Sequence, residues 1–145
     1  MSSSMDDSSD SGYVLSLPPD HYAYYSPIKK GDHISKVKEF YGLDSDPQAY
    51  NSAQDPWMYD LSQYGILIFF DKAFNVYVIR FDVGFKGKLE GIGIGDTEEA
   101  MLKLKGEPAK RWKFGPDEEA CAYYKNGFVR YDINHKTKRI VRMFR

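Results

Sequence analysis

Two stretches of the chain are dense in apolar residues of the kind that form β-strands. Residues 64–70 and 76–81 are rich in β-branched and aromatic side chains, and the short segment 71–75 separates them. This composition predicts two strands of one hairpin. A weaker strand is expected over 89–94, where two glycines interrupt the apolar pattern.

The last third of the chain predicts further strands. They are expected near residues 110–114, 120–124, 128–133 and 139–144. The tripeptide 125–127, Lys-Asn-Gly, predicts a tight turn, because Asn-Gly readily adopts positive φ.

Two short helices are expected, each after a Gly-Asp pair. The aspartates of these pairs, Asp32 and Asp96, are good N-caps, and apolar residues recur at helical spacing after each. Gly42 and Gly106 end the two segments. The two pairs and the two terminal glycines match at a single offset of 64 residues, which indicates a repeated unit.

We therefore predict an α+β fold of two tandem helix-plus-antiparallel-strand repeats, which form one curved sheet with helices on one face. The repeats are expected at about 28–84 and 92–145, within a single domain that covers 13–145. Residues 1–12 are rich in Ser and Asp and have almost nothing apolar to bury, so we expect a disordered tail.

The segment from Ile92 to Pro108 resembles the opening of the SmpA/OmlA domain of small outer-membrane assembly lipoproteins. Two such units in tandem resemble the architecture of beta-lactamase inhibitory protein, in which a concave sheet binds an enzyme. This sequence lacks the lipidation cysteine of the lipoproteins and the cysteine pairs of the secreted inhibitor. The resemblance thus implies an intracellular binder of similar shape, such as a bacterial immunity protein that protects against a toxin.

Charge is distributed unevenly along the chain, although the net charge is only −1. Residues 1–12 sum to −3 and residues 13–102 to −5, whereas residues 103–145 sum to +7. One acidic and one basic surface could each meet a charged partner, or both could simply be solvated. In the basic part, residues 110–114 interleave basic with aromatic side chains. Contact with nucleic acid is one interpretation, and aromatic rings that face a core with charges outward is the other.

Catalytic and cofactor motifs are absent from the sequence, so we predict a protein that is not an enzyme and needs no cofactor or metal. The three histidines lie far apart, and Cys121, the single cysteine, is flanked by alanines as expected of a small buried residue. No segment is apolar enough to span a membrane, and the N-terminus has no secretory signal. A cytoplasmic location without membrane partners is the expectation.

The connection from Leu43 to Tyr64 is long and combines acidic with aromatic residues. Long connections in compact domains are often functional, so we predict that it binds a partner. The residues expected to do so are Asp44, Asp46, Tyr50, Asp55, Trp57, Tyr59 and Asp60. The alternative is that Trp57 and Tyr59 begin a strand and pack inward while the aspartates form turns.

The function predicted from these features is that of a protein-binding inhibitor. Its most specific form is a cytoplasmic bacterial immunity protein that occludes the active site of a cognate cationic toxin domain. An assembly or scaffolding module similar to the SmpA/OmlA domain is the alternative, and a nucleic-acid-binding protein is a third hypothesis.

Overall fold

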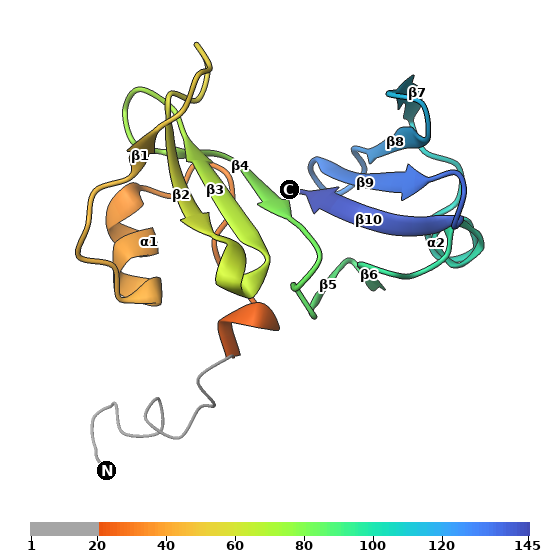
Figure 1. Cartoon of the computed structure of the whole chain (residues 1–145), viewed down its shortest axis with the longest axis horizontal. Helices are drawn as coiled ribbons and strands as arrows, with labels where there is room; N and C mark the ends of the chain where they lie inside the picture. The colour runs from red at the N-terminus through yellow and green to blue at the C-terminus, as the bar shows by residue number, and fades with distance from the viewer. Residues whose placement is uncertain (1–20) are drawn as a thin grey trace.

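One antiparallel sheet of eight strands dominates the chain, as the computed structural model shows (Figure 1). The structure describes residues 21–145, so the predicted disordered tail lies outside the described residues. In chain order the strands of this sheet are β1 (Gln48–Ala49), β2 (Trp57–Leu61), β3 (Ile66–Phe70), β4 (Val76–Phe81), β7 (Lys110–Phe114), β8 (Glu118–Tyr123), β9 (Val129–Asn134) and β10 (Arg139–Phe144). Their order across the sheet is β1-β2-β3-β4-β10-β9-β8-β7.

Strands β4 and β10 pair at the middle of the sheet and join its two wings, β1–β4 and β7–β10. Phe81 lies opposite Met143, and Arg80 lies opposite Phe144. Beyond this pair, the Ile79 amide donates to the Arg145 carbonyl at 2.8 Å and the Arg145 amide donates back at 2.9 Å. The joint is therefore short, and it brings together residues that are more than 60 positions apart in the sequence.

The remaining elements are small. Each wing has one α-helix, and a two-stranded hairpin connects the wings. Two short 3₁₀-helices lie earlier in the chain than this hairpin. These elements are α1 (Ile34–Tyr41), α2 (Glu98–Lys105), the hairpin strands β5 (Lys88–Leu89) and β6 (Ile92–Gly93), and the 3₁₀-helices η2 (His21–Ala23) and η3 (Ser62–Tyr64).

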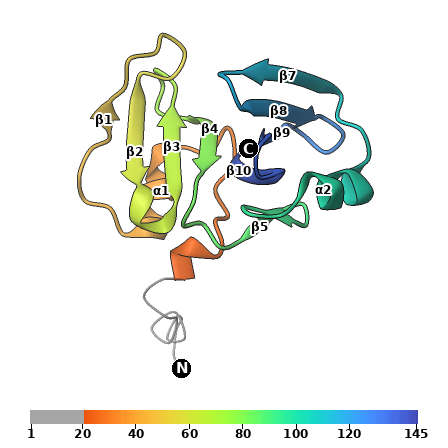
Figure 2. The same cartoon turned by 45° about the vertical axis from the view of Figure 1, so that its right-hand side comes forward.

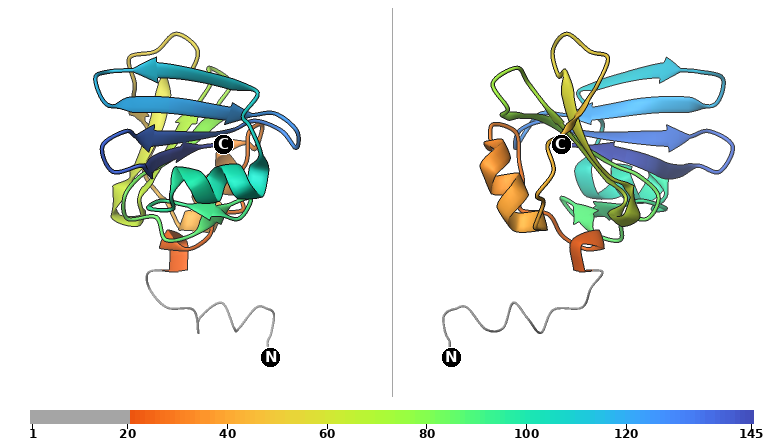
Figure 3. Two further views of the ribbon diagram at one scale, coloured as in Figure 1. Left: turned by 90° about the vertical axis from the view of Figure 1, so that its right-hand side faces the viewer. Right: turned by 60° about the vertical axis from the view of Figure 1, so that its left-hand side comes forward.

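Within residues 21–145, the α-helices lie on the outer side of the two wings, and neither of them lies between the wings (Figures 2 and 3). The hydrophobic core fills the side of the sheet that carries the helices. Val37 and Met101 from the helices are fully buried there, as are Ile68 of β3 and Tyr131 of β9. Alternate residues of each strand consequently point into the core or toward the opposite face.

The predicted fold class, an α+β fold of two tandem helix-plus-strand repeats, is wrong. The eight-stranded sheet makes up most of the structure, and each of the two α-helices has only eight residues. Gly42 and Gly106 stop the helices after about two turns, so helical segments contribute little core. About half of the aromatic and β-branched residues lie instead in strands, which pair edge to edge to form one sheet.

The two helices begin in the same local manner, but their N-caps are not the predicted aspartates. His33 and Thr97 are the N-caps, and their side chains accept hydrogen bonds from the amides of Ser35 and Ala100. Asp32 and Asp96 each accept a backbone hydrogen bond from three residues earlier, at 2.9 Å and 2.8 Å. The aspartates therefore close a turn that precedes each helix.

Strands were only partly predicted. The hairpin is confirmed as β3 and β4, although β3 begins at Ile66 because η3 and Gly65, with φ of 71°, form a turn before it. The predicted strand over 89–94 is instead the two-residue strands β5 and β6. The expected long connection contains β1, β2 and η3, and so the strand alternative for Trp57 and Tyr59 is confirmed.

Gly65 should be far less replaceable than Gly42. Both have positive φ, but a Cβ at Gly65 would lie 2.2 Å from the Phe85 amide nitrogen, whereas one at Gly42 would meet nothing within 4 Å. We expect Gly42→Ala to lower the free energy of unfolding by about 1 kcal/mol through backbone strain alone. Gly65→Ala should cost about 3 kcal/mol or more, because backbone must also move. Urea denaturation of both variants measures the difference, and equal losses would contradict the close packing of this turn.

Candidate functional site on the concave face of the sheet

The candidate site is the sheet face that points away from the helices, which we call the concave face (Figure 2). Strand registers place its residues side by side: Arg130 lies opposite Phe144, and Asp132 lies opposite both Arg142 and Ala120. Charged and aromatic side chains from five strands gather on this face. They are Arg80, Asp82, Trp112, Phe114, Glu118, Arg130, Asp132, Arg142 and Phe144.

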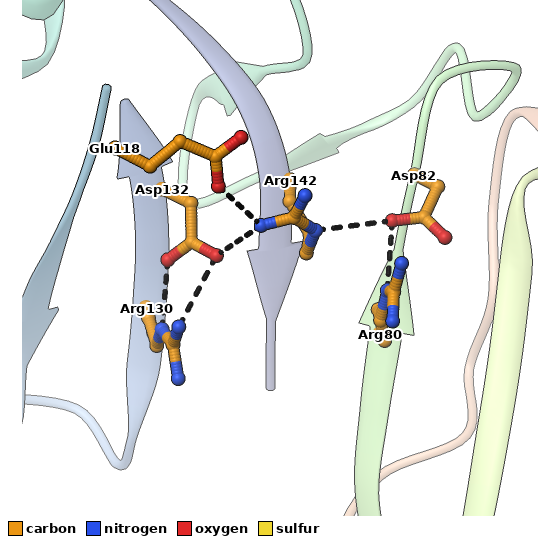
Figure 4. A network of polar contacts seen from close by, with 6 residues as sticks. All are labelled: Arg80, Asp82, Glu118, Arg130, Asp132 and Arg142. Atoms are coloured by element: carbon orange, nitrogen blue, oxygen red, sulfur yellow. Dashed lines mark hydrogen bonds and ion pairs between the residues drawn. The ribbon is translucent and has the colours of Figure 1, made fainter. Parts of the chain in front are cut away.

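Asp132 is the centre of a network of ion pairs on this face (Figure 4). Its Oδ1 accepts from Arg130 Nε at 2.7 Å, and its Oδ2 accepts from Arg130 Nη2 at 3.2 Å and from Arg142 Nη1 at 2.8 Å. The Asp132 side chain is completely buried beneath these partners. A buried carboxylate is stable only when it is paired in this way, so both arginines are fixed by it.

The network continues across the joint between the two wings. Arg142 Nη1 also donates to Glu118 at 3.0 Å, and Arg142 Nε lies 3.6 Å from Asp82 Oδ1. Asp82 in turn accepts from Arg80 Nε at 2.9 Å (Figure 4). Burial lowers the pKa of Arg142, but its hydrogen bonds to Glu118 and Asp132 outweigh this and raise the pKa above its usual value. Arg142 is therefore a fixed positive charge that links β9 to β4.

Aromatic rings surround the guanidinium of Arg130. Its Cζ lies 4.4 Å from the ring centroid of Phe144, 5.1 Å from that of Trp112 and 5.3 Å from that of Phe114. Each distance is within the range of a cation–π contact. Trp112 remains 39% exposed although it contacts this group. The interpretation of residues 110–114 with rings toward a core is therefore wrong, because their aromatic side faces the uncovered surface of the sheet.

A cavity of about 760 Å³ adjoins this cluster where β10 ends. Arg130 and Phe144 belong both to its lining and to the concave face. The remaining lining residues come from the segment before α1, from β4, from the turn between β5 and β6, from the turn before β9 and the start of that strand, and from the residue after β10. They are Tyr25, Ser26, Pro27, Lys29, Lys30, Tyr77, Val78, Glu90, Asn126, Gly127, Phe128, Val129 and Arg145.

The aspartates predicted to bind a partner lie in different environments. Asp44, Asp46 and Asp60 are exposed, whereas Asp55 is buried and accepts a hydrogen bond from the Ser52 hydroxyl. Asp60 accepts from the Ser62 amide at 2.9 Å, as a turn-forming residue does. Asp46 pairs with a lysine of α1 at 3.3 Å.

The predicted aromatic residues also separate. Tyr59 is 5% exposed on the core side, where its hydroxyl donates to the Ser45 carbonyl at 2.6 Å. Trp57 stacks on Phe74, and together with Asp46 it lines a hollow of about 340 Å³ beside α1. Tyr50 is exposed and contacts the edge of Phe69. The structure thus brings Asp46 and Trp57 together but not the whole set, and partner binding by these residues stays a prediction.

Apart from Trp112 and Phe114, the residues of the concave face were missed, although the sequence contains a signal for them. Two Arg-aromatic-Asp triplets occur, one at residues 80–82 and one at 130–132. Because side chains alternate along a strand, the arginine and the aspartate of each triplet share one face and the aromatic residue takes the other. Each triplet therefore indicates a charged pair on the face opposite a buried ring.

Cys121 does not contribute a reactive group to this face. Burial raises the pKa of the Cys121 thiol to about 11, so the thiol is protonated at neutral pH, and its side chain points to the core side. Within residues 21–145, no group of three or more His, Cys, Asp or Glu side chains is arranged to hold a metal ion. None of the helices in that range is long and apolar enough to cross a membrane.

No family model matches this sequence, and no curated protein matches it. A solved structure is similar to it: an extracellular protein containing an SCP domain from Bacillus anthracis str. Ames. The match has a TM-score of 0.57 at 16% sequence identity and covers 97% of this chain and 47% of that protein. This likeness shows a shared fold alone, and this chain spans about half the length of the similar protein. The resemblance to SmpA/OmlA units stays a prediction.

The two triplets allow a matched test of the network. Asp132→Ala should lower the free energy of unfolding by about 3 kcal/mol, because it leaves two arginines partly buried without their carboxylate. Asp82→Ala removes a carboxylate that is 30% exposed, and should cost at most about 1 kcal/mol. Chemical denaturation of both variants gives the comparison. Similar losses would show that Asp132 does not organise this face.

Proposed function

We propose that this chain is a protein-binding domain whose concave face receives a partner protein. The observation that supports this most is the group of Trp112, Phe114 and Phe144 around Arg130, on the sheet face that neither α1 nor α2 covers. Tryptophan and arginine are the residues most enriched among those that contribute most to protein interfaces. Leaving such a cluster partly exposed has a cost unless a partner covers it.

The rigidity of this cluster also supports binding. Arg130 is held by two hydrogen bonds to Asp132 and by three rings, so its side chain loses little freedom when a partner docks. A preorganised anchor of this kind contributes more to affinity than a mobile surface arginine does. The pairing of charges also leaves the network nearly neutral, which suits the mixed polar and apolar surface of a protein.

The ion pairs argue against nucleic acid as the partner. The C-terminal region is strongly basic in sequence, but several of its arginines are engaged by carboxylates. Arg111 bonds to Glu98 at 2.8 Å and to Glu119 at 3.0 Å, and Arg142 bonds to two carboxylates on the concave face. Phosphate binding depends on cations that are free to replace counterions, so this basic charge is less available than the composition indicates.

An inhibitor that occludes a partner's active site is the narrower form of this proposal. In this narrower form, the chain is the immunity protein predicted from the sequence. The toxin as its partner and its cytoplasmic location stay predictions. An assembly or scaffolding module would also bind through this face but would leave its partner active. Titrating the purified partner's activity with this chain separates the two: loss of activity at a 1:1 ratio favours the inhibitor.

Replacing Trp112 tests the proposed surface. The tagged chain would be used to isolate its partner from cells of the source organism, and the dissociation constant would then be measured with purified components. Trp112→Ala should weaken binding at least about tenfold, as expected for loss of a central anchor. Leu104→Ala is the control, because Leu104 is 60% exposed on α2, away from the concave face.

The Leu104→Ala control also identifies the result that would contradict the proposed surface. A partner whose affinity falls with Leu104→Ala but not with Trp112→Ala would bind the outer side, and the proposal would be wrong. Melting temperatures of both variants must stay close to that of the unmodified chain, so that a loss of affinity reports on contact and not on folding.

A further inference from the structure

The cavity at the end of β10 has an excess of positive charge. Its lining contains four cationic side chains, from Lys29, Lys30, Arg130 and Arg145, and one carboxylate side chain, from Glu90. Glu90 is itself paired with Lys105. The lining therefore contains four cationic side chains and a single carboxylate side chain, which Lys105 already neutralises.

Two of these cations, Lys30 and Arg145, are held by groups other than carboxylates. The Lys30 ammonium lies 5.1 Å from the centroid of the Tyr77 ring. The Arg145 guanidinium donates to the carbonyls of Ser26 and Ile28 at 3.0 Å and 2.6 Å. Within the described residues, neither Lys30 nor Arg145 forms an ion pair, so no carboxylate there neutralises either charge.

The cavity also exposes apolar surface at its mouth. Tyr25 is 61% exposed, Tyr77 is 38% exposed and Phe128 is 37% exposed. Phe144 continues this aromatic lining into the group around Arg130. The cavity is thus continuous with the surface proposed to bind a partner, and it combines positive charge with rings.

We propose that this cavity binds an acidic segment of the partner protein, with carboxylates beside an aromatic or aliphatic side chain. This inference rests on the proposed protein-binding function and specifies the chemistry of the partner. Carboxylates of the segment would pair with Lys29, Lys30 and Arg145, and its apolar side chain would pack on Tyr77 and Phe128. A polynucleotide needs a track of phosphate contacts, whereas these cations surround one cavity that fits a few side chains.

The test uses a fluorescein-labelled peptide, Gly-Asp-Glu-Trp-Asp-Glu-Gly, and a matched peptide in which lysine replaces every acidic residue. Fluorescence anisotropy with the full chain at low salt gives the dissociation constants. We expect the acidic peptide to bind at least tenfold more tightly than the lysine peptide. The double variant Lys29→Glu, Lys30→Glu should weaken the acidic peptide at least tenfold.

The control is a double variant with the same change in net charge. Lys72 and Lys103 are exposed and lie outside the cavity lining. Lys72→Glu, Lys103→Glu should change the affinity for the acidic peptide by less than twofold. Equal effects of the two double variants would show that only net charge matters, and would overturn the proposal.

Three further outcomes are informative. A labelled single-stranded RNA that binds more tightly than the acidic peptide, and depends on the same two lysines, would overturn the proposal in favour of nucleic acid. Failure of the acidic peptide to bind, while Trp112→Ala still weakens the isolated partner, would refute the acidic segment and leave the proposed function intact. The proposed function fails separately if the peptide binds as expected but Trp112→Ala has no effect on the partner.

Discussion

The pairing of β4 with β10 is the interaction on which the rest of the structure depends. Only three consecutive residue pairs form it, from Ile79 and Arg145 to Phe81 and Met143. Without it the chain would be two separate sheets of four strands, each with one eight-residue helix as its cover. With it, both wings contribute to one hydrophobic core on the side of the helices. The same joint also makes the opposite face of the sheet, the concave face, continuous across both wings.

Charge and aromatic packing strengthen this joint from the concave face. Arg142 bonds to Asp132 and Glu118 within its own wing and approaches Asp82 in the other. Arg145 continues the link beside the end of β10, where it donates to the carbonyls of Ser26 and Ile28. Because partly buried ion pairs are rigid when every member is satisfied, the surface next to the joint is held in one arrangement before any partner arrives. Stability and proposed binding thus use the same side chains.

Local sequence patterns predicted the local elements well. The hairpin of β3 and β4, the ends of both helices at Gly42 and Gly106, and strands near β8, β9 and β10 follow from composition and turn residues. The predicted fold class was wrong because the repeated pattern in the sequence did not show how small the helices are relative to the sheet. Strand β2 was predicted only as an alternative, since Asp60 interrupts its apolar run and its stability comes from pairing with β3.

The candidate site was harder to predict than the strands that build it. Alternation along β7 shows that Trp112 and Phe114 share a face, but it does not show whether that face is covered. That depends on the placement of the helices, which lie on the outer side of both wings (Figure 3). Likewise, the neighbours of Arg142 come from β4, β8 and β9, and only the strand order places them together. The Arg-aromatic-Asp triplets can be recognised in the sequence, whereas their proximity cannot.

The most direct test of this account is site-specific photo-crosslinking inside the source cells. A benzoylphenylalanine side chain would be introduced at position 112 on the concave face in one strain, and at position 104 on the outer side in another. The account predicts a discrete crosslinked protein adduct from position 112 and none from position 104. An adduct from position 104 alone would contradict it, because the partner would then lie against the helices and not in the concave face.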